Sequence, residues 1–63
     1  MTKEFFKNRI EALVRTHNTF NKAKHTAACK DYKAALENTL ATAKRNGFEF
    51  TYTTTKAGYI HLA

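Results

Sequence analysis

Few residues in this chain have types and spacings that could support chemistry, and the first to consider are its one cysteine and three histidines. His25 and Cys29 stand four residues apart, so they would share one face of a helix, with His17 further back in the chain. Zinc requires three or four such ligands in a tetrahedron, and the sequence contains neither a C-x-x-C nor an H-x-x-x-H pair. Surface histidines and a buried free thiol explain these residues better than a metal site does. We predict no bound metal and no other cofactor.

Catalytic residues are equally hard to assemble from this sequence. A cysteine nucleophile needs a base and an orienting group, which Cys29 would have to recruit from His25 or His61. The five acidic residues are scattered, and two glycines cannot form a glycine-rich phosphate loop. A chain of 63 residues also leaves little volume for the pocket that a substrate usually occupies. We predict that the protein is not an enzyme.

Positive charge is the property of this sequence that departs most from the ordinary. Eleven Lys and Arg residues against five Asp and Glu residues give a formal net charge of +6. Five cations lie between residues 15 and 33 beside one acid, Asp31; they are Arg15, Lys22, Lys24, Lys30 and Lys33. Glu11 and Glu37 would neutralise two of them from one helical turn away, which leaves Lys22, Lys24 and Lys30 without an opposite charge. Such a cluster attracts polyanions, although the same charge also keeps a small domain soluble.

A first amphipathic helix is predicted over about residues 3–22. Apolar residues recur at three- and four-residue steps from Phe6 to Phe20, and Thr2 is placed to cap the N-terminus. The pattern weakens between Asn18 and Thr26, where poor helix formers accumulate without a glycine or proline. We therefore predict a break near residues 22–26, with Thr26 capping the next helix.

A second helix is predicted over about residues 27–45. Apolar residues from Ala28 to Ala43 keep the spacing of one helix face. Asn46-Gly47 predicts its end, because glycine accepts the left-handed conformation that closes many helices. Phe48 is then placed to fold back on the last helical turn.

A β-hairpin is predicted over residues 48–62. Phe48, Phe50 and Tyr52 alternate with polar residues, which puts three aromatic rings on one face of a strand. Residues 55–58 fit a type I turn that ends on a glycine in the left-handed region. This turn sets Tyr52 opposite Leu62, and it puts Ile60 and Leu62 on the same face as the aromatic rings. The polar face then carries Tyr59 and His61 among threonines, a second candidate surface for a partner.

Together these elements predict one α+β domain, residues 1–63, with the order α-α-β-β in two layers. The competing arrangement is one long helix from Thr2 to Arg45 that forms a dimer. A homodimer is also a candidate for the folded-back arrangement, because Ala27, Ala28, Ala34 and Ala41 make the second helix slim and the core is small. The single cysteine favours a reducing, cytoplasmic location, and no apolar run approaches the length of a membrane span.

Two functions from different classes follow from these features. The first is a small, basic, non-enzymatic protein that binds nucleic acid, with Arg15, Lys22, Lys24, Lys30 and Lys33 contacting phosphates. The alternative is a modulator or inhibitor that binds an acidic surface of a larger protein, such as one that processes nucleic acid. It would use the same five cations, with Tyr59 and His61 as a second partner-binding surface. The sequence fits neither a helix-turn-helix, which needs a third helix, nor an aromatic RNA-binding sheet.

Overall fold

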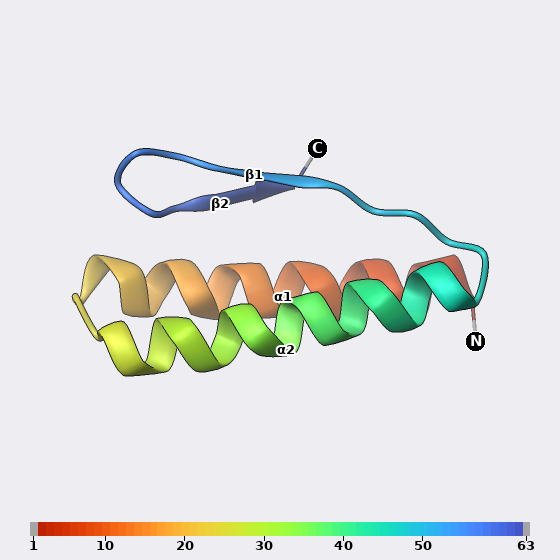
Figure 1. Ribbon diagram of the computed structural model, residues 1–63, viewed down its shortest axis with the longest axis horizontal. Coiled ribbons are helices and arrows are strands. Elements are labelled where there is room, and N and C mark those ends of the chain that lie inside the picture. The colour runs from red at the N-terminus through yellow and green to blue at the C-terminus, as the bar shows by residue number, and fades with distance from the viewer. Residues whose placement is uncertain (1, 63) are drawn as a thin grey trace.

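Two antiparallel helices lie side by side, and a β-hairpin runs along one face of the pair (Figure 1). The computed structural model describes residues 2–62. The elements in chain order are α1 (Lys3–Lys22), α2 (Thr26–Arg45), β1 (Tyr52–Thr54) and β2 (Ile60–Leu62). This arrangement confirms the predicted α+β class with the order α-α-β-β, and it contradicts the single long helix.

Helix α1 begins as the sequence predicts and ends on an unexpected residue. The Thr2 hydroxyl accepts a hydrogen bond from the Phe5 amide at 3.2 Å, which caps the first turn. At the other end, Lys24 adopts a φ of 60°. Its amide donates to the Asn21 carbonyl at 3.1 Å, and the His25 amide donates to the Phe20 carbonyl at 3.0 Å. These two bonds form a Schellman motif, with lysine in the place that glycine usually occupies.

Helix α2 begins one residue earlier than predicted. His25 occupies the N-cap position without a side-chain hydrogen bond, and Thr26 is the first helical residue. The prediction that Thr26 caps this helix is therefore wrong, because the chain leaves the Schellman turn already positioned to start the helix. The C-terminus follows the prediction: Gly47 has a φ of 87°, its amide donates to the Lys44 carbonyl, and the Phe48 amide donates to the Ala43 carbonyl.

The hairpin has the predicted register and is anchored to α1 by side chains. Tyr52 pairs with Leu62 and Thr54 pairs with Ile60 in an antiparallel ladder. The Asn18 amide group donates to the Ile60 carbonyl at 2.9 Å and accepts from the Ile60 amide at 2.9 Å. Asn18 thus supplies both hydrogen bonds that a neighbouring strand would supply at this position.

The core lies between the helix pair and the hairpin. Its buried apolar residues come from α1, α2 and β2: Phe6, Ile10, Val14, Leu36, Ala43 and Ile60. Phe48, Phe50 and Tyr52 pack against this core but are only half-buried. Of these three residues only Tyr52 lies in β1, and Phe48 and Phe50 lie in the segment before it. The three rings cover the edge of the core, and the aliphatic Ile60 occupies its interior.

Candidate functional site

The turn between the helices and the tip of the hairpin lie at the same end of the molecule (Figure 1). The Asn21 side chain donates a hydrogen bond to the Ala57 carbonyl at 3.0 Å, which holds the tip against the end of α1. This contact brings Lys56 to the end that already carries Lys22 and Lys24, and all three side chains are exposed. We call Lys22, Lys24, Lys30 and Lys56 the basic end.

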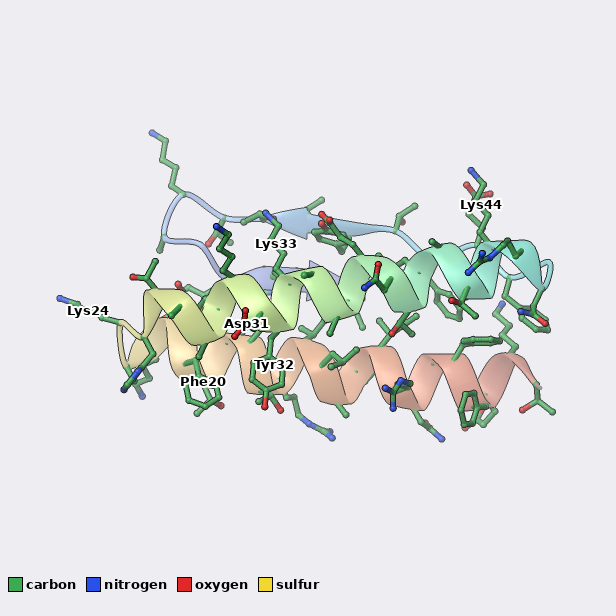
Figure 2. The ribbon with its side chains drawn as sticks, turned by 60° about the horizontal axis from the view of Figure 1, so that its bottom comes forward. Phe20, Lys24, Asp31, Tyr32, Lys33 and Lys44 are labelled. Carbon is green, nitrogen blue, oxygen red and sulfur yellow. The ribbon has the colours of Figure 1, made fainter. Side chains whose placement is uncertain are left out.

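Lys24 stands at the apex of the basic end in a backbone conformation that lysine rarely adopts. Its side chain extends beyond the helices into solvent (Figure 2). A left-handed conformation costs a residue with a Cβ about 1–2 kcal/mol relative to glycine. The chain thus has a lysine at a position where glycine would adopt the same backbone conformation at a lower cost in free energy.

The remaining predicted cations, which include Lys30 of the basic end, are distributed over a wider area. Lys30 and Lys33 are exposed on the first turns of α2, and Lys33 points to the side of the helix pair that faces the hairpin (Figure 2). Arg15 precedes the end of α1 by about two turns, which places its Cα roughly 10 Å from that of Lys22. Asp31 is the acidic residue in this part of α2, and it is also exposed. The structure therefore places Lys22, Lys24 and Lys56 at one end of the molecule and leaves Arg15 about two turns back along α1.

Three aromatic residues gather beside the basic end, outside the main core. The rings of Phe20 and Tyr32 stack with centroids 5.5 Å apart and an interplanar angle of 19°. His25 meets Phe20 edge-on, with centroids 5.8 Å apart. Phe20 and Tyr32 are half-buried and lie on the side of the helix pair away from the hairpin (Figure 2). We call Phe20, His25 and Tyr32 the aromatic cluster.

Sequence reasoning placed Phe20 and Tyr32 on apolar helix faces and did not foresee that they would meet outside the core. It also left out Lys56. The sequence could have predicted the contact between Phe20 and His25, because these residues occupy the two positions whose side chains are often in contact in a Schellman motif. Nothing in the sequence near Lys56 indicated that it would join the basic end. The hairpin tip is held against α1 by the Asn21–Ala57 hydrogen bond, which joins residues far apart in the sequence.

The second predicted surface is less open than the sequence indicated. Tyr59 is half-buried, and its amide donates to the Thr55 hydroxyl at 3.1 Å within the turn. His61 is exposed and lies opposite Thr53 on the outer face of the sheet. The alanines that make α2 slim differ in exposure: Ala27, Ala34 and Ala41 are exposed, and Ala28 is half-buried.

Buried and half-buried polar groups where the second half of α1 meets the start of α2 are engaged with the backbone or with each other. The Cys29 thiol lies 3.7 Å from the His17 carbonyl, and His17 Nδ1 lies 3.1 Å from Asn18 Oδ1. Because Asn18 Oδ1 already accepts from the Ile60 amide, it also accepts here, so His17 carries its proton on Nδ1. Residues 2–62 contain no group of three or more His, Cys, Asp or Glu side chains arranged to hold a metal ion.

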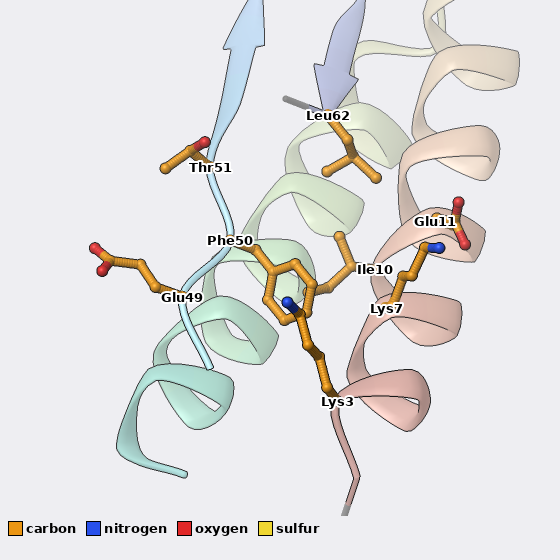
Figure 3. A pocket seen from close by; sticks show the side chains of 8 residues that line it. All are labelled: Lys3, Lys7, Ile10, Glu11, Glu49, Phe50, Thr51 and Leu62. Carbon is orange, nitrogen blue, oxygen red and sulfur yellow. The ribbon is translucent and has the colours of Figure 1, made fainter. Parts of the chain in front are cut away.

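A groove of about 530 Å³ lies at the opposite end of the molecule from the helix turn (Figure 3). Phe50 and Ile10 form part of its wall, Lys3 and Lys7 extend across it, and Glu11 and Glu49 are also among its lining residues. This lining provides charge and an apolar wall but no cysteine or histidine.

None of the helices within residues 2–62 has the length and hydropathy needed to cross a bilayer.

The pKa of Tyr52 is raised in the folded protein. Burial raises the pKa of the Tyr52 phenol above its ordinary value of 10.0, and the nearby Glu37 carboxylate raises this pKa further by its charge and its hydrogen bond. The Tyr52 hydroxyl donates to Glu37 Oε1 at 3.3 Å, which links β1 to α2.

Comparisons with models of protein families, with characterised proteins and with solved structures find no match for this chain.

Proposed function

We propose that this protein binds nucleic acid without catalysing a reaction and contacts phosphates through the basic end. Lys22, Lys24 and Lys56 come from the end of α1, the interhelical turn and the hairpin tip, and Lys30 adds a fourth cation from α2. Within residues 2–62, Asp31 is the acid nearest in sequence to this group. Lysines that protrude from a small convex end can reach successive phosphates along a strand.

The conformation of Lys24 is the observation that carries this proposal. Residues in unfavourable backbone conformations persist where function requires the side chain, because selection for stability alone would remove them. Glycine at position 24 would close α1 with less strain, yet the chain places a cation there. A role for the ammonium group outside the folded domain explains this choice.

The aromatic cluster adds a second type of contact beside the lysines. Half-exposed aromatic rings stack on unpaired bases, a contact that is tolerant of sequence. Tyr32 and Phe20 are therefore placed to favour single-stranded over double-stranded nucleic acid, with phosphates held by Lys22 and Lys24.

Fluorescence anisotropy at several salt concentrations tests the proposal, with single- and double-stranded oligonucleotides of one sequence. Three or four phosphate contacts on a duplex predict a slope of log K against log salt of about −3 to −4, because each neutralised phosphate releases counterions. Substitution of Lys22, Lys24 and Lys30 by Glu should abolish this binding. The three side chains are exposed, so circular dichroism should show an unchanged fold.

The matched control carries the same substitutions at Lys3, Lys7 and Lys44, which are exposed and lie away from the basic end. Both variants have a formal net charge of zero, because three Lys→Glu substitutions remove three positive charges and add three negative ones, which lowers the net charge from +6 by six. The control should retain most of its affinity. Equal loss in the two variants would show that net charge alone causes binding, and a parent that binds no oligonucleotide at low salt would favour the acidic protein partner.

A further inference from the structure

The two edges of the β-hairpin differ in a way that points to a partner. On β2, the amide and carbonyl of Ile60 point away from β1, and Asn18 satisfies both at 2.9 Å. Asn21 likewise binds the Ala57 carbonyl next to this edge. Helix α1 therefore closes the β2 edge with asparagine side chains.

The β1 edge has no equivalent cover. Thr55 donates its amide to the Tyr59 carbonyl, so Thr53 and Thr55 direct their backbone groups toward β2. Because these directions alternate along a strand, Tyr52 and Thr54 direct their amides and carbonyls outward. Among residues 2–62, these outward groups have no hydrogen-bond partner, and the contact between β1 and α2 is the Tyr52–Glu37 hydrogen bond.

The residues of this edge also lack the usual protection against strand pairing. Natural edge strands are guarded by charged residues such as lysine, by a proline, by a bulge or by being very short, and β1 has three residues but none of the guards that depend on residue type. The stretch from Phe50 to Thr55 reads FTYTTT, which contains no charge, no proline and no glycine, and every residue in it favours a β-strand. Such a segment on an open edge is suited to accept a further strand.

We propose that a second copy of this chain pairs with this edge, β1 against β1 in antiparallel orientation, with Thr53 opposite Thr53 of the other copy. In this register, Tyr52 lies opposite Thr54 of the other copy, and their outward groups form four hydrogen bonds across the twofold axis. The two hairpins then make one four-stranded sheet, which is more stable than two separate hairpins.

Charged residues on both sides of β1 favour pairing with a second copy of the chain in this register. Glu49 precedes β1 and is exposed, and its side chain points away from Phe50 and the core (Figure 3). The antiparallel pairing brings Glu49, which precedes β1, toward the hairpin tip of the other copy, where Lys56 has a long and exposed side chain. It also directs the two basic ends away from each other, which limits repulsion between two chains of charge +6.

Sedimentation equilibrium of the whole chain tests the pairing, with Thr54→Pro as the first variant. Proline removes the outward amide of Thr54 but none of the hydrogen bonds between β1 and β2. The parent should dimerise at high micromolar concentration, Thr54→Pro should be monomeric, and Thr54→Val should dimerise like the parent. A parent that is monomeric at about 1 mM, or a Thr54→Pro variant that dimerises equally, overturns the proposal.

A crosslinking experiment tests the register without relying on the proline variant. Thr53 directs its backbone groups toward β2, so Thr53 and its copy would form a non-hydrogen-bonded pair with Cα atoms about 4.5 Å apart, a distance that suits a disulfide. In a Cys29→Ala background, Thr53→Cys should form a disulfide-linked dimer under mild oxidation. Thr51→Cys should not, because Thr51 would face Thr55 of the other copy. Equal crosslinking at both positions, or none at position 53, overturns the register.

A charge exchange tests the same register in solution. Glu49→Lys should weaken the dimer roughly tenfold, because two like-charged contacts would replace two opposite-charged ones across the axis. The double variant Glu49→Lys with Lys56→Glu should return the dissociation constant to within about twofold of the parent value. A double variant that is as weak as the single one contradicts the contact between Glu49 and Lys56.

Discussion

At the scale of single residues, polar side chains determine how the hairpin sits on the helices. Asn18 replaces a neighbouring strand at Ile60, and His17 donates to the same Asn18 oxygen. These groups are half-buried or buried, so water cannot fully replace a lost partner. Asn18 therefore has a larger role in stability than its position on a helix surface indicates.

We expect Asn18→Ala to lower the free energy of unfolding by about 2 kcal/mol, because it removes two hydrogen bonds to Ile60 and leaves buried groups unpaired. Urea denaturation measures the change. Asn8→Ala is the control, since Asn8 is exposed on the same helix and should change stability by less than about 0.5 kcal/mol. Equal effects at the two positions would contradict the role assigned to Asn18.

Tyr52 should make stability depend on pH in the alkaline range. Its pKa is raised in the folded protein, first by burial and then by Glu37, so the unfolded chain loses this proton at a lower pH. Above about pH 10 the unfolded state binds fewer protons, and stability falls until the pH passes the folded pKa. Tyr52→Phe lacks this ionisation, so the difference in stability between parent and variant should be constant below about pH 9 and change above it.

Urea denaturation of both proteins from pH 8 to pH 11 provides the measurement. All other ionisable groups are shared by parent and variant, so their contribution cancels in the difference. A difference that stays constant up to pH 11 would show that Tyr52 ionises alike in the folded and unfolded chains.

At the scale of elements, the two helices end with the same motif but with different residues. Gly47 closes α2 at a φ of 87°, and Lys24 closes α1 at a φ of 60°. In both motifs an aromatic residue follows: Phe48 packs on Phe6 with centroids 5.9 Å apart, and His25 packs on Phe20. The same hydrogen bonds thus form at both ends, and α1 bears a backbone strain that α2 avoids.

We expect Lys24→Gly to stabilise the fold by about 0.5–1 kcal/mol, because the relief of strain exceeds the entropy that glycine adds to the unfolded chain. For a domain of this size, the melting temperature should rise by about 3–6 °C. The same variant should weaken oligonucleotide binding, because it removes the cation at the apex of the basic end. A Lys24→Gly variant that is more stable but binds oligonucleotides with unchanged affinity would show that Lys24 does not contribute to the proposed binding.

At the scale of the whole molecule, one small core joins α1, α2 and β2. Phe6 is 2% exposed and belongs to this core, whereas Phe50 is half-buried beside the groove. A domain of this length has a free energy of unfolding of roughly 3–9 kcal/mol, so a single core substitution can unfold it.

We therefore expect Phe6→Ala to cost about 3–5 kcal/mol and Phe50→Ala about half as much. Thermal unfolding followed by far-ultraviolet circular dichroism and by tyrosine fluorescence measures both. The helical signal and the tyrosine signal should change together, since helices and hairpin share the core. Separate transitions, or a larger loss for Phe50→Ala, would contradict a single core in which Phe6 is more deeply buried than Phe50.

The sequence alone determined the elements and their order, because these depend on residues a few positions apart. Apolar spacing predicted both helices, Gly47 marked the end of α2, and alternation with the turn at residues 55–58 set the hairpin register. Thr26 was misplaced by one residue, because the Schellman turn before it decides where α2 starts.

Only the tertiary structure decided which residues form the candidate site and which strand edge is open. Asn18 meets Ile60 across 42 residues of sequence, and Asn21 meets Ala57 across 36. These contacts bring Lys56 to the basic end and close one edge of the sheet while the other stays open. They depend on how α1 and the hairpin pack together, and no periodicity within either element encodes that packing. The left-handed Lys24 has the same origin, since the need to fold α2 back onto α1 imposes the turn on whichever residue stands there.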